Sequence, residues 1–357
     1  MYKPVSGDFY AQIMLQCHFY TAGLAVYIKL DGADTLLPRC NLWTPMNPST
    51  ASRTALATSL IRAVHSRADP APLLDDTWGD RFVPESVRAA FRQPALDRME
   101  PDARTKALTL PELVLDRVLR ANAAYADVII RARYTEDALK LAVTRGICQY
   151  VIIGAGFDSF AYRRPPYASQ LEIFEIDHPA TQGLKRQRLI ECGVPDSNSL
   201  HFIPADLSVE QLGEALARSN FQPTQPTFFS WLGVTMYLTR EANLDALRAI
   251  ASCAPAGSEL VFTYVDDAVF SSTYAYTESF RQLKSAVSSS GEAFLSGFDP
   301  GTIGKQLQCA GLLLLEDLNG EQMVARFDKD GTNGLQSSTA AHIAHARIAG
   351  VFMPSAV

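Results

Sequence analysis

Apolar and polar positions follow two different rhythms along this chain, and the change falls near residue 149. Before it, apolar residues recur at helical spacing, as at Leu56, Leu60 and Val64. This spacing predicts helices near 51–65, 85–93, 111–133 and 135–145. Beyond residue 149, short apolar runs rich in β-branched and aromatic residues alternate with helical segments, which is typical of strands joined by helices.

The second part of the chain predicts seven strands and the helices between them. The strands are expected at Gln149–Ile153, Leu171–Ile176, Leu200–Ile203, Thr227–Trp231, Glu259–Tyr264, Leu312–Asp317 and Gln322–Phe327. The clearest helices are expected at Pro179–Cys192, Val209–Ser219 and Arg240–Cys253. Alternation of this kind predicts an α/β fold, with an open and mostly parallel sheet covered on both faces. Asn319-Gly320 separates the last two strands and predicts an antiparallel C-terminal hairpin.

These rhythms suggest a division of the chain into segments. Residues 1–45 precede the first helical pattern and are treated as an extension of uncertain status. Residues 46–145 are expected to form an N-terminal helical cap, and residues 146–330 the sheet domain. Within that domain, 266–299 fits neither rhythm and is interpreted as an inserted lid. Residues 331–357 are left as a C-terminal tail.

Composition narrows the class of protein. The 357 residues are 47% hydrophobic and carry a net charge of −6, which favours a globular protein and argues against a nucleic-acid-binding surface. Polar residues interrupt the apolar stretch Phe9–Ile28, so no membrane span is expected. The six cysteines are scattered without a Cys-x-x-Cys pair, which predicts no metal site and a cytoplasmic protein with reduced thiols.

The stretch from Gln149 to Arg163 carries the strongest chemical signal. A buried strand runs into a Gly154-Ala-Gly156 turn, and a helix start is expected after it. Glycines have no Cβ, so the backbone there can approach a ligand closely. The N–H groups exposed at such a turn suit an anionic or strongly polar ligand. We therefore expect a ligand at this loop, which also contains Asp158.

Each of the next strands also ends in a residue able to bind a ligand. Asp177 ends the second strand about 20 residues past the glycines, a position suited to ribose hydroxyls. Asp206 and Leu207 follow the third strand, where they would suit an adenine amine and ring. Trp231 ends the fourth strand. Open α/β sheets bind ligands at this edge, so the ordered set predicts one site.

These motifs together resemble the leucine carboxyl methyltransferase-like family of class I S-adenosylmethionine-dependent O-methyltransferases. The resemblance runs from about residue 49 to 330 and includes bacterial small-molecule enzymes. It rests on four ordered stretches: Gly154-Ala-Gly-Phe-Asp-Ser-Phe-Ala-Tyr-Arg163, Phe174-Glu-Ile-Asp-His-Pro179, Ala205-Asp-Leu207 and Gly233-Val-Thr-Met-Tyr-Leu238. Upstream, Ser52-Arg-Thr-Ala55 through Arg62-Ala63, Leu73-Leu-Asp-Asp76 and Arg133-Tyr-Thr-Glu-Asp137 also look like the cap of that family. It implies a Rossmann-like methyltransferase fold with S-adenosylmethionine as cofactor and a small-molecule methyl acceptor.

The resemblance also implies roles for single residues. Gly154 would approach the methionine part of the cofactor, and Arg133 would pair with its carboxylate. Asp177 would take the ribose hydroxyls, while Asp206 and Leu207 would hold adenine. Gly156 and Asp158 belong to the same loop and are expected to contribute to it.

One departure separates this chain from the family's eukaryotic members. Leu232 stands where they carry a glutamate that helps to hold the cofactor. The methionine amino group would then be held by backbone carbonyls near Ser230 and Trp231. Tyr237 and Tyr264, at the ends of the fourth and fifth strands, are the best candidates for the acceptor pocket.

The acceptor oxygen has two alternatives. A carboxylate, which the resemblance favours, is ionised at neutral pH and needs no general base. A phenol or alcohol needs one, and His178 is the obvious candidate at the strand ends, although a structural role at a helix start suits it better.

Two rival functions are considered. A nicotinamide-dependent oxidoreductase would share the Gly-x-Gly turn, but Ser159 stands where the third glycine would be. The second rival is a non-catalytic interaction module that binds the cofactor, and Leu232 is the only feature of the sequence that favours it.

Overall fold

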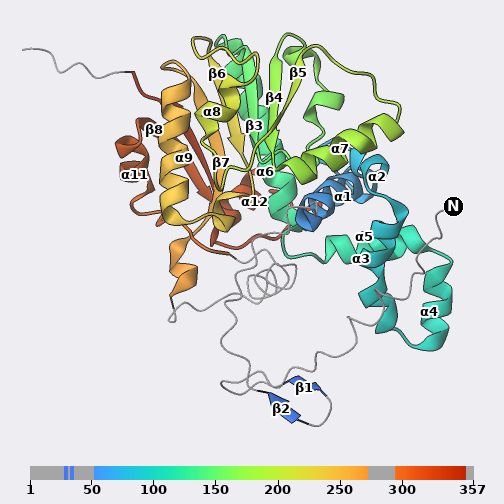
Figure 1. Ribbon diagram of the computed structural model, residues 1–357. Coiled ribbons are helices and arrows are strands. Elements are labelled where there is room, and N and C mark those ends of the chain that lie inside the picture. The colour runs from blue at the N-terminus through green and yellow to red at the C-terminus, as the bar shows by residue number, and fades with distance from the viewer. Residues whose placement is uncertain (1–27, 31–32, 36–51, 272–293, 351–357) are drawn as a thin grey trace, which may run out of the picture. The chain divides into compact units, whose positions relative to one another are not determined.

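The computed structural model describes residues 28–30, 33–35, 52–271 and 294–350 (Figure 1). The chain divides into two compact units, Met1–Pro45 and Met46–Val357. In the first unit, β1 (Ile28–Leu30) pairs with β2 (Ala33–Thr35) in antiparallel orientation.

Removing residues 1–45 is expected to leave the second unit intact. A chain that starts at Met46 should keep its melting temperature and its affinity for S-adenosylhomocysteine, since the helical pattern begins after Met46. Thermal unfolding of both chains, with calorimetric titration, measures this. A fall of more than about 5 °C, roughly one to two kcal/mol for a protein of this size, would mean that the extension stabilises the core.

Six helices of the described residues precede the sheet. They are α1 (Arg53–Ala68), α2 (Trp78–Phe82), α3 (Glu85–Asp97), α4 (Pro101–Leu108), α5 (Pro111–Arg120) and α6 (Tyr125–Thr144). Ser52 caps α1 by accepting a hydrogen bond from the N–H of Ala55 at 3.1 Å. The predicted division into helices 111–133 and 135–145 is wrong. Asn122 turns the chain by accepting from the N–H of Ala124, so the break falls before α6.

A seven-stranded sheet with the order β5-β4-β3-β6-β7-β9-β8 forms the centre of the unit (Figure 1). Its strands are β3 (Gln149–Ile153), β4 (Glu172–Asp177), β5 (Leu200–Pro204), β6 (Thr227–Trp231), β7 (Glu259–Val265), β8 (Leu312–Asn319) and β9 (Ala341–Ile348). The first five strands in this order are mutually parallel, while β9 is antiparallel to both of its neighbours. The predicted mostly parallel sheet with an antiparallel C-terminal pair is therefore confirmed.

Helices cover both faces of the sheet, and each face has its own apolar core. One core joins the sheet to α1, α5, α6, α7 (Pro179–Glu191) and α12 (Gly320–Phe327). The other joins it to α8 (Leu212–Ala217), α9 (Arg240–Cys253) and α11 (Ile303–Cys309). The parallel strands therefore end at one edge, where loops from both faces meet. No helix of the described residues is long and apolar enough to cross a membrane.

The prediction of a strand at Gln322–Phe327 was wrong, because this segment is the helix α12. Asn319 does not begin a tight hairpin turn. Its side chain accepts from the N–H of Gln322 while the Gln322 side chain accepts from the N–H of Asn319, each at 2.9 Å. This reciprocal cap starts a helix, and Met323 and Phe327 then lie on neighbouring turns of one face.

The final strand lies instead in the range assigned to a C-terminal tail. Residues 341–348 form β9, which is inserted between β7 and β8. Its two histidines and one arginine hid the apolar pattern of a central strand, although five of its eight residues are hydrophobic. Most of the predicted lid, 272–293, lies outside the described residues. At its borders, Asp266 pairs with Phe298 in an isolated parallel bridge.

Candidate functional site

Two glycines shape the loop that follows β3. The backbone φ angles of Gly154 and Gly156 are 68° and 50°, in the left-handed region that favours glycine. A Cβ atom on Gly154 would lie 2.5 Å from Cγ2 of Val234, and one on Gly156 would lie 3.1 Å from Cβ of Ala55. The predicted ligand loop is therefore pressed between the residues after β6 and the first turn of α1.

Asp177, the last residue of β4, lies directly on this loop. Its carboxylate accepts hydrogen bonds from the backbone N–H of Gly156 and, at 2.6 Å, from that of His178. Burial raises the pKa of Asp177, and these two donors offset that effect only in part. Each carboxylate oxygen can accept more than one hydrogen bond, so Asp177 remains able to bind a hydroxylated ligand.

His178 has the structural position that its sequence context favoured. Its Nδ1 accepts a hydrogen bond from the backbone N–H of Ala180 at 3.2 Å, which caps α7. A nitrogen used in this way is a poor proton acceptor for a reaction.

The next strand end brings Asp206 and Leu207 beside Asp177. The backbone N–H of Ala205 donates to the carbonyl of Asp177 at 2.9 Å, which joins the ends of β4 and β5. Asp206 Oδ1 accepts from the backbone N–H of Ser208 at 3.0 Å and from its hydroxyl at 2.6 Å. Leu207 is half-buried against the second apolar core. The two acids thus follow neighbouring strands, as predicted.

Trp231 and Asp158 are engaged within the protein. The Trp231 side chain is only 1% exposed and packs against Phe262, and its Nε1 has no hydrogen-bond partner among the described residues. Only the Trp231 backbone can therefore reach a ligand at the sheet edge. Asp158 Oδ1 accepts from the backbone N–H of Phe160 at 2.8 Å and so holds the glycine loop in shape.

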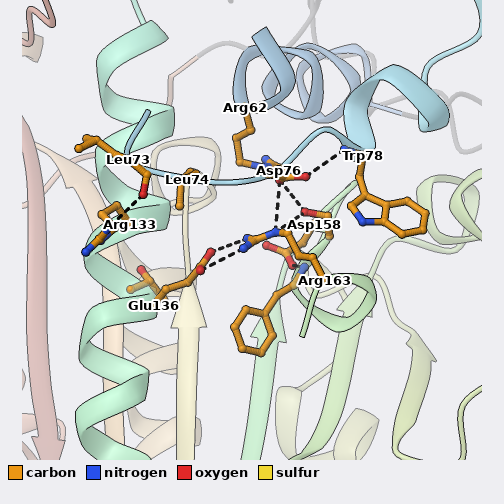
Figure 2. Close-up of polar contacts among 12 residues, drawn as sticks. Arg62, Leu73, Leu74, Asp76, Trp78, Arg133, Glu136, Asp158 and Arg163 are labelled. Carbon is orange, nitrogen blue, oxygen red and sulfur yellow. Dashed lines mark hydrogen bonds and ion pairs between the residues drawn. The ribbon is translucent and has the colours of Figure 1, made fainter. Parts of the chain in front are cut away.

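Arg133 is occupied elsewhere, whereas Arg131 lies at the sheet edge. Arg133 donates to the carbonyl of Leu73 and to Asp137, each at 2.9 Å, and its side chain is 41% exposed (Figure 2). The guanidinium of Arg131 instead lies against Gly233, where a Cβ atom would be 2.7 Å from Nη1. Burial lowers the pKa of Arg131 by more than the charge of Asp127 raises it, and no described residue accepts a hydrogen bond from its guanidinium or forms an ion pair with it.

Sequence reasoning missed Arg131 because both arginines lie in one Arg-Ala-Arg-Tyr stretch. The two side chains are two residues apart on α6, so they cannot point in the same direction. The signal that favours Arg131 is its spacing of four from Asp127, which also lines the cavity described below.

A buried ionic network fastens the glycine loop to the cap (Figure 2). Asp76 Oδ2 accepts from Arg62 Nε at 2.7 Å and from the Ser159 hydroxyl at 2.5 Å, and it lies 3.6 Å from Arg163 Nε. Arg62 also donates to the carbonyl of Phe157 at 2.7 Å. Because Phe157 and Ser159 belong to the loop, the network holds the loop in place from the cap side.

A cavity of about 530 Å³ opens beside Arg131 and Gly233. Its apolar wall includes Ile61, Val128, Met236 and Met323. The polar groups on its wall come from the first turn of α1, from α6 and from the ends of β7 and β9, and they include Arg53, Thr54, Asp127, Arg131, Thr263 and His342. Such a cavity suits a small molecule with an apolar body and a few polar groups.

Both tyrosines predicted for the acceptor pocket line this cavity. Tyr237 is half-buried, and its ring centroid lies 5.8 Å from that of Phe294. Tyr264 is almost fully buried and donates its hydroxyl to Asp317 Oδ2 at 2.9 Å. Burial, with the charge of Asp317, raises the pKa of Tyr264 well above its ordinary value. Tyr264 is thus a neutral wall residue and a poor base.

The sequence profile of the leucine carboxyl methyltransferase family matches residues 55–251. The chain belongs to this family. The match spans most of the cap, the glycine loop and the first four parallel strands, so it covers the ends of β3, β4, β5 and β6. The chain is therefore an S-adenosylmethionine-dependent methyltransferase, and the fold and cofactor predicted from its motifs are confirmed.

Individual relatives agree with this family. The chain is 31% identical to "Putative S-adenosyl-L-methionine-dependent methyltransferase YktD" of Bacillus subtilis over 84% of this chain and 99% of the relative. A protein described as a putative S-adenosyl-L-methionine-dependent methyltransferase from Mycobacterium sp. (strain JLS) is 30% identical over 70% of this chain and 77% of its own length. A solved putative methyltransferase from Thermobifida fusca shares the fold, with a TM-score of 0.51, 14% identity and coverage of 86% and 99%.

The residues at the sheet edge fit this cofactor. Val234 and Ala55 occupy the places where Cβ atoms on Gly154 and Gly156 would lie, so this close-packed loop requires glycine, and the Arg131 guanidinium beside it forms no ion pair among the described residues. Asp177 and Asp206 present carboxylates at neighbouring strand ends. Leu232 is half-buried against the first apolar core. It contributes no polar group to the site.

Substituting Asp177 with Ala is expected to weaken binding of S-adenosylmethionine by about 2–4 kcal/mol, because two charge-assisted hydrogen bonds to the ribose would be lost. Asp177→Asn keeps one acceptor oxygen and should lose less. Calorimetric titration with S-adenosylhomocysteine measures both variants, and circular dichroism checks that they fold. An unchanged dissociation constant for the Ala variant would show that Asp177 only fastens the glycine loop.

Proposed function

We propose that this methyltransferase transfers the methyl group to an oxygen atom of a small organic acid, with a carboxylate as the preferred acceptor. The observation that carries the proposal is the pair of arginines on the cavity wall. Neither Arg131 nor Arg53 forms an ion pair with any described residue, although both line the same cavity. The charge of Asp127, on the same wall, acts on Arg131 without an ion pair between them, so both guanidinium groups can still donate hydrogen bonds to anionic groups.

Arg131 is the better partner for the carboxylate of the cofactor. It lies against Gly233, and Val234 in turn lies against Gly154, so its guanidinium is at the carboxyl ends of β3 and β6. Burial of this guanidinium is costly, and the charge of Asp127 offsets that cost only in part, so a bound carboxylate would stabilise it further. Arg53, in the first turn of α1, is then available for the acid to be methylated.

S-adenosylmethionine supplies an activated methyl group on a sulfonium centre. The protein therefore has to hold the acceptor oxygen in line with that methyl group and keep water out, which can supply several powers of ten in rate. The apolar cavity wall excludes water, and the glycine loop, held by Asp76 and Asp177, fixes the position of the cofactor. A carboxylate acceptor needs no general base, which agrees with the structural role of His178.

Turnover on a panel of organic acids tests this function. Methyl ester products are expected, at a rate that stays nearly flat from pH 6 to pH 8 because acceptors with a pKa of about 4 are already ionised. His178→Ala should turn over at the wild-type rate. A rate that climbs with pH, or a hundredfold loss in the His178 variant, would instead identify a phenol or alcohol acceptor.

Ligand binding tests whether the protein is a methyltransferase and not a nicotinamide-dependent oxidoreductase. Calorimetry should detect S-adenosylmethionine and no nicotinamide dinucleotide, because Ser159 occupies the position of the third glycine and its hydroxyl is bonded to Asp76.

A further inference from the structure

A histidine that sequence reasoning did not single out lies on the cavity wall. His342, the second residue of β9, is 8% exposed, and its ring stacks on that of Tyr264 with centroids 4.8 Å apart. Its Nδ1 lies 3.2 Å from Asp317 Oδ2 and 3.2 Å from the Tyr264 hydroxyl. Three side chains from β7, β8 and β9 thus form one hydrogen-bonded cluster beside the cavity.

The cluster determines which nitrogen of His342 opens onto the cavity. Asp317 accepts from the Tyr264 hydroxyl, and an N–H at Nδ1 completes the hydrogen bonds of this carboxylate. Nε2 has no partner among the described residues, and it is not one of the buried side-chain atoms sealed from solvent. Because His342 lines the cavity, Nε2 presents a lone pair to whatever fills it.

The position of β9 decides what this lone pair can contact. Arg53 lies near the glycine loop after β3, because Ala55 contacts Gly156. In the sheet, β9 is three strands away from β3, a separation of about 14 Å at the usual strand spacing. His342 therefore lies on the side of the cavity away from Arg53. It would contact the end of the acceptor opposite to the carboxylate.

We infer that the acceptor acid carries a hydroxyl group, or another hydrogen-bond donor, at the end remote from its carboxylate, and that His342 Nε2 accepts this hydrogen bond. The inference rests on the proposed acid acceptor and narrows its class. The acid has an apolar body that packs against the cavity wall formed by Ile61, Val128 and Met323. Asp317 and Tyr264 act as positioning residues that hold the tautomer and orientation of His342.

Paired acids that differ only in the hydroxyl test this inference. The protein loaded with S-adenosylhomocysteine is titrated with ω-hydroxydecanoate against decanoate, and with para-coumarate against cinnamate. At least one hydroxylated acid should bind about tenfold more tightly than its partner, because an unhydroxylated acid leaves Nε2 buried without a partner. In His342→Phe, which keeps the ring stack on Tyr264, this preference should disappear while the unhydroxylated acid binds as before.

His201 supplies a matched control. It also stacks on an aromatic ring, that of Phe174, at 4.8 Å, and its Nε2 contacts Glu172 at 2.8 Å, but it lies on β5 and does not line the cavity. His201→Phe should keep the full preference for the hydroxylated acid.

The outcomes separate this inference from the proposed function. Equal wild-type affinity within both pairs overturns the role of His342 and leaves the acid acceptor standing, a comparison that needs no variant to fold. A preference that survives in His342→Phe overturns it as well. Failure of all four acids to bind contradicts the proposed acid acceptor, and the inference falls with it.

Discussion

Arg131→Gln is expected to weaken binding of S-adenosylhomocysteine by about 2–4 kcal/mol, roughly thirtyfold to a thousandfold, whereas Arg133→Gln should bind almost as the wild type does. The guanidinium of Arg131 is enclosed beside Gly233 and forms no ion pair with a described residue, so a bound carboxylate would make charge-assisted hydrogen bonds with it. Arg133 already pairs with Asp137 and Leu73 at the surface.

The two variants control for each other, since they make the same substitution two residues apart on α6. Calorimetry gives the dissociation constants, and thermal unfolding shows whether either variant loses stability. The reverse pattern, with Arg133→Gln losing affinity and Arg131→Gln keeping it, would restore the assignment made from sequence resemblance. It would also mean that the side chain of Arg133 turns inward when the cofactor binds.

The second large effect is a loss of stability when Asp76 is removed from the buried ionic network shown in Figure 2. Asp76→Ala should destabilise the fold by about 3–5 kcal/mol, because it leaves Arg62 buried without its carboxylate. For a protein of this size this is a fall in melting temperature on the order of 10 °C. The exposed neighbour Asp75 provides the control, and Asp75→Ala should unfold within about 2 °C of the wild type.

The same substitution should change the response to acid. Burial alone would raise the pKa of Asp76, but Arg62, Arg163 and Ser159 lower it below its ordinary value of 3.8. A lowered pKa means that the ionised carboxylate stabilises the fold above pH 3.8 and that this contribution is lost as the pH falls through the folded value. Asp76→Ala should therefore lack this acid-dependent component. Equal stability of the Asp76→Ala and Asp75→Ala variants would show that the network contributes nothing measurable.

The first five strands could be predicted within one or two residues, because their apolar runs are continuous and bounded by clear turn residues. The order of Asp177, Asp206 and Trp231 at their ends followed from the same pattern. The C-terminal pair could not be located in this way. Met323, Val324 and Phe327 form a short apolar run that suits either a strand or a helix face, and only the reciprocal cap at Asn319 decides for the helix.

The candidate site shows the same limit. A one-dimensional pattern identifies Asp177, whose position follows from the end of a strand, but it cannot distinguish Arg131 from Arg133, whose directions depend on the rotation of α6. His342 was missed for a related reason. It lies about 80 residues beyond its neighbour Tyr264 in a segment interpreted as a tail, and only the pairing of β7 with β9 brings the two together.

The position of β9 in the sheet also determines the order in which parts of the fold can form during synthesis. Strand β7 is made some 80 residues before the segment that must lie beside it, so its outer edge stays unpaired until residues 341–348 leave the ribosome. The nascent chain can assemble the parallel strands and the glycine loop first, since these need no later residue. The cavity wall that bears His342 is completed last. A chain cut short before residue 341 would expose one long strand edge and invite aggregation, even though every residue expected to hold the cofactor had been made.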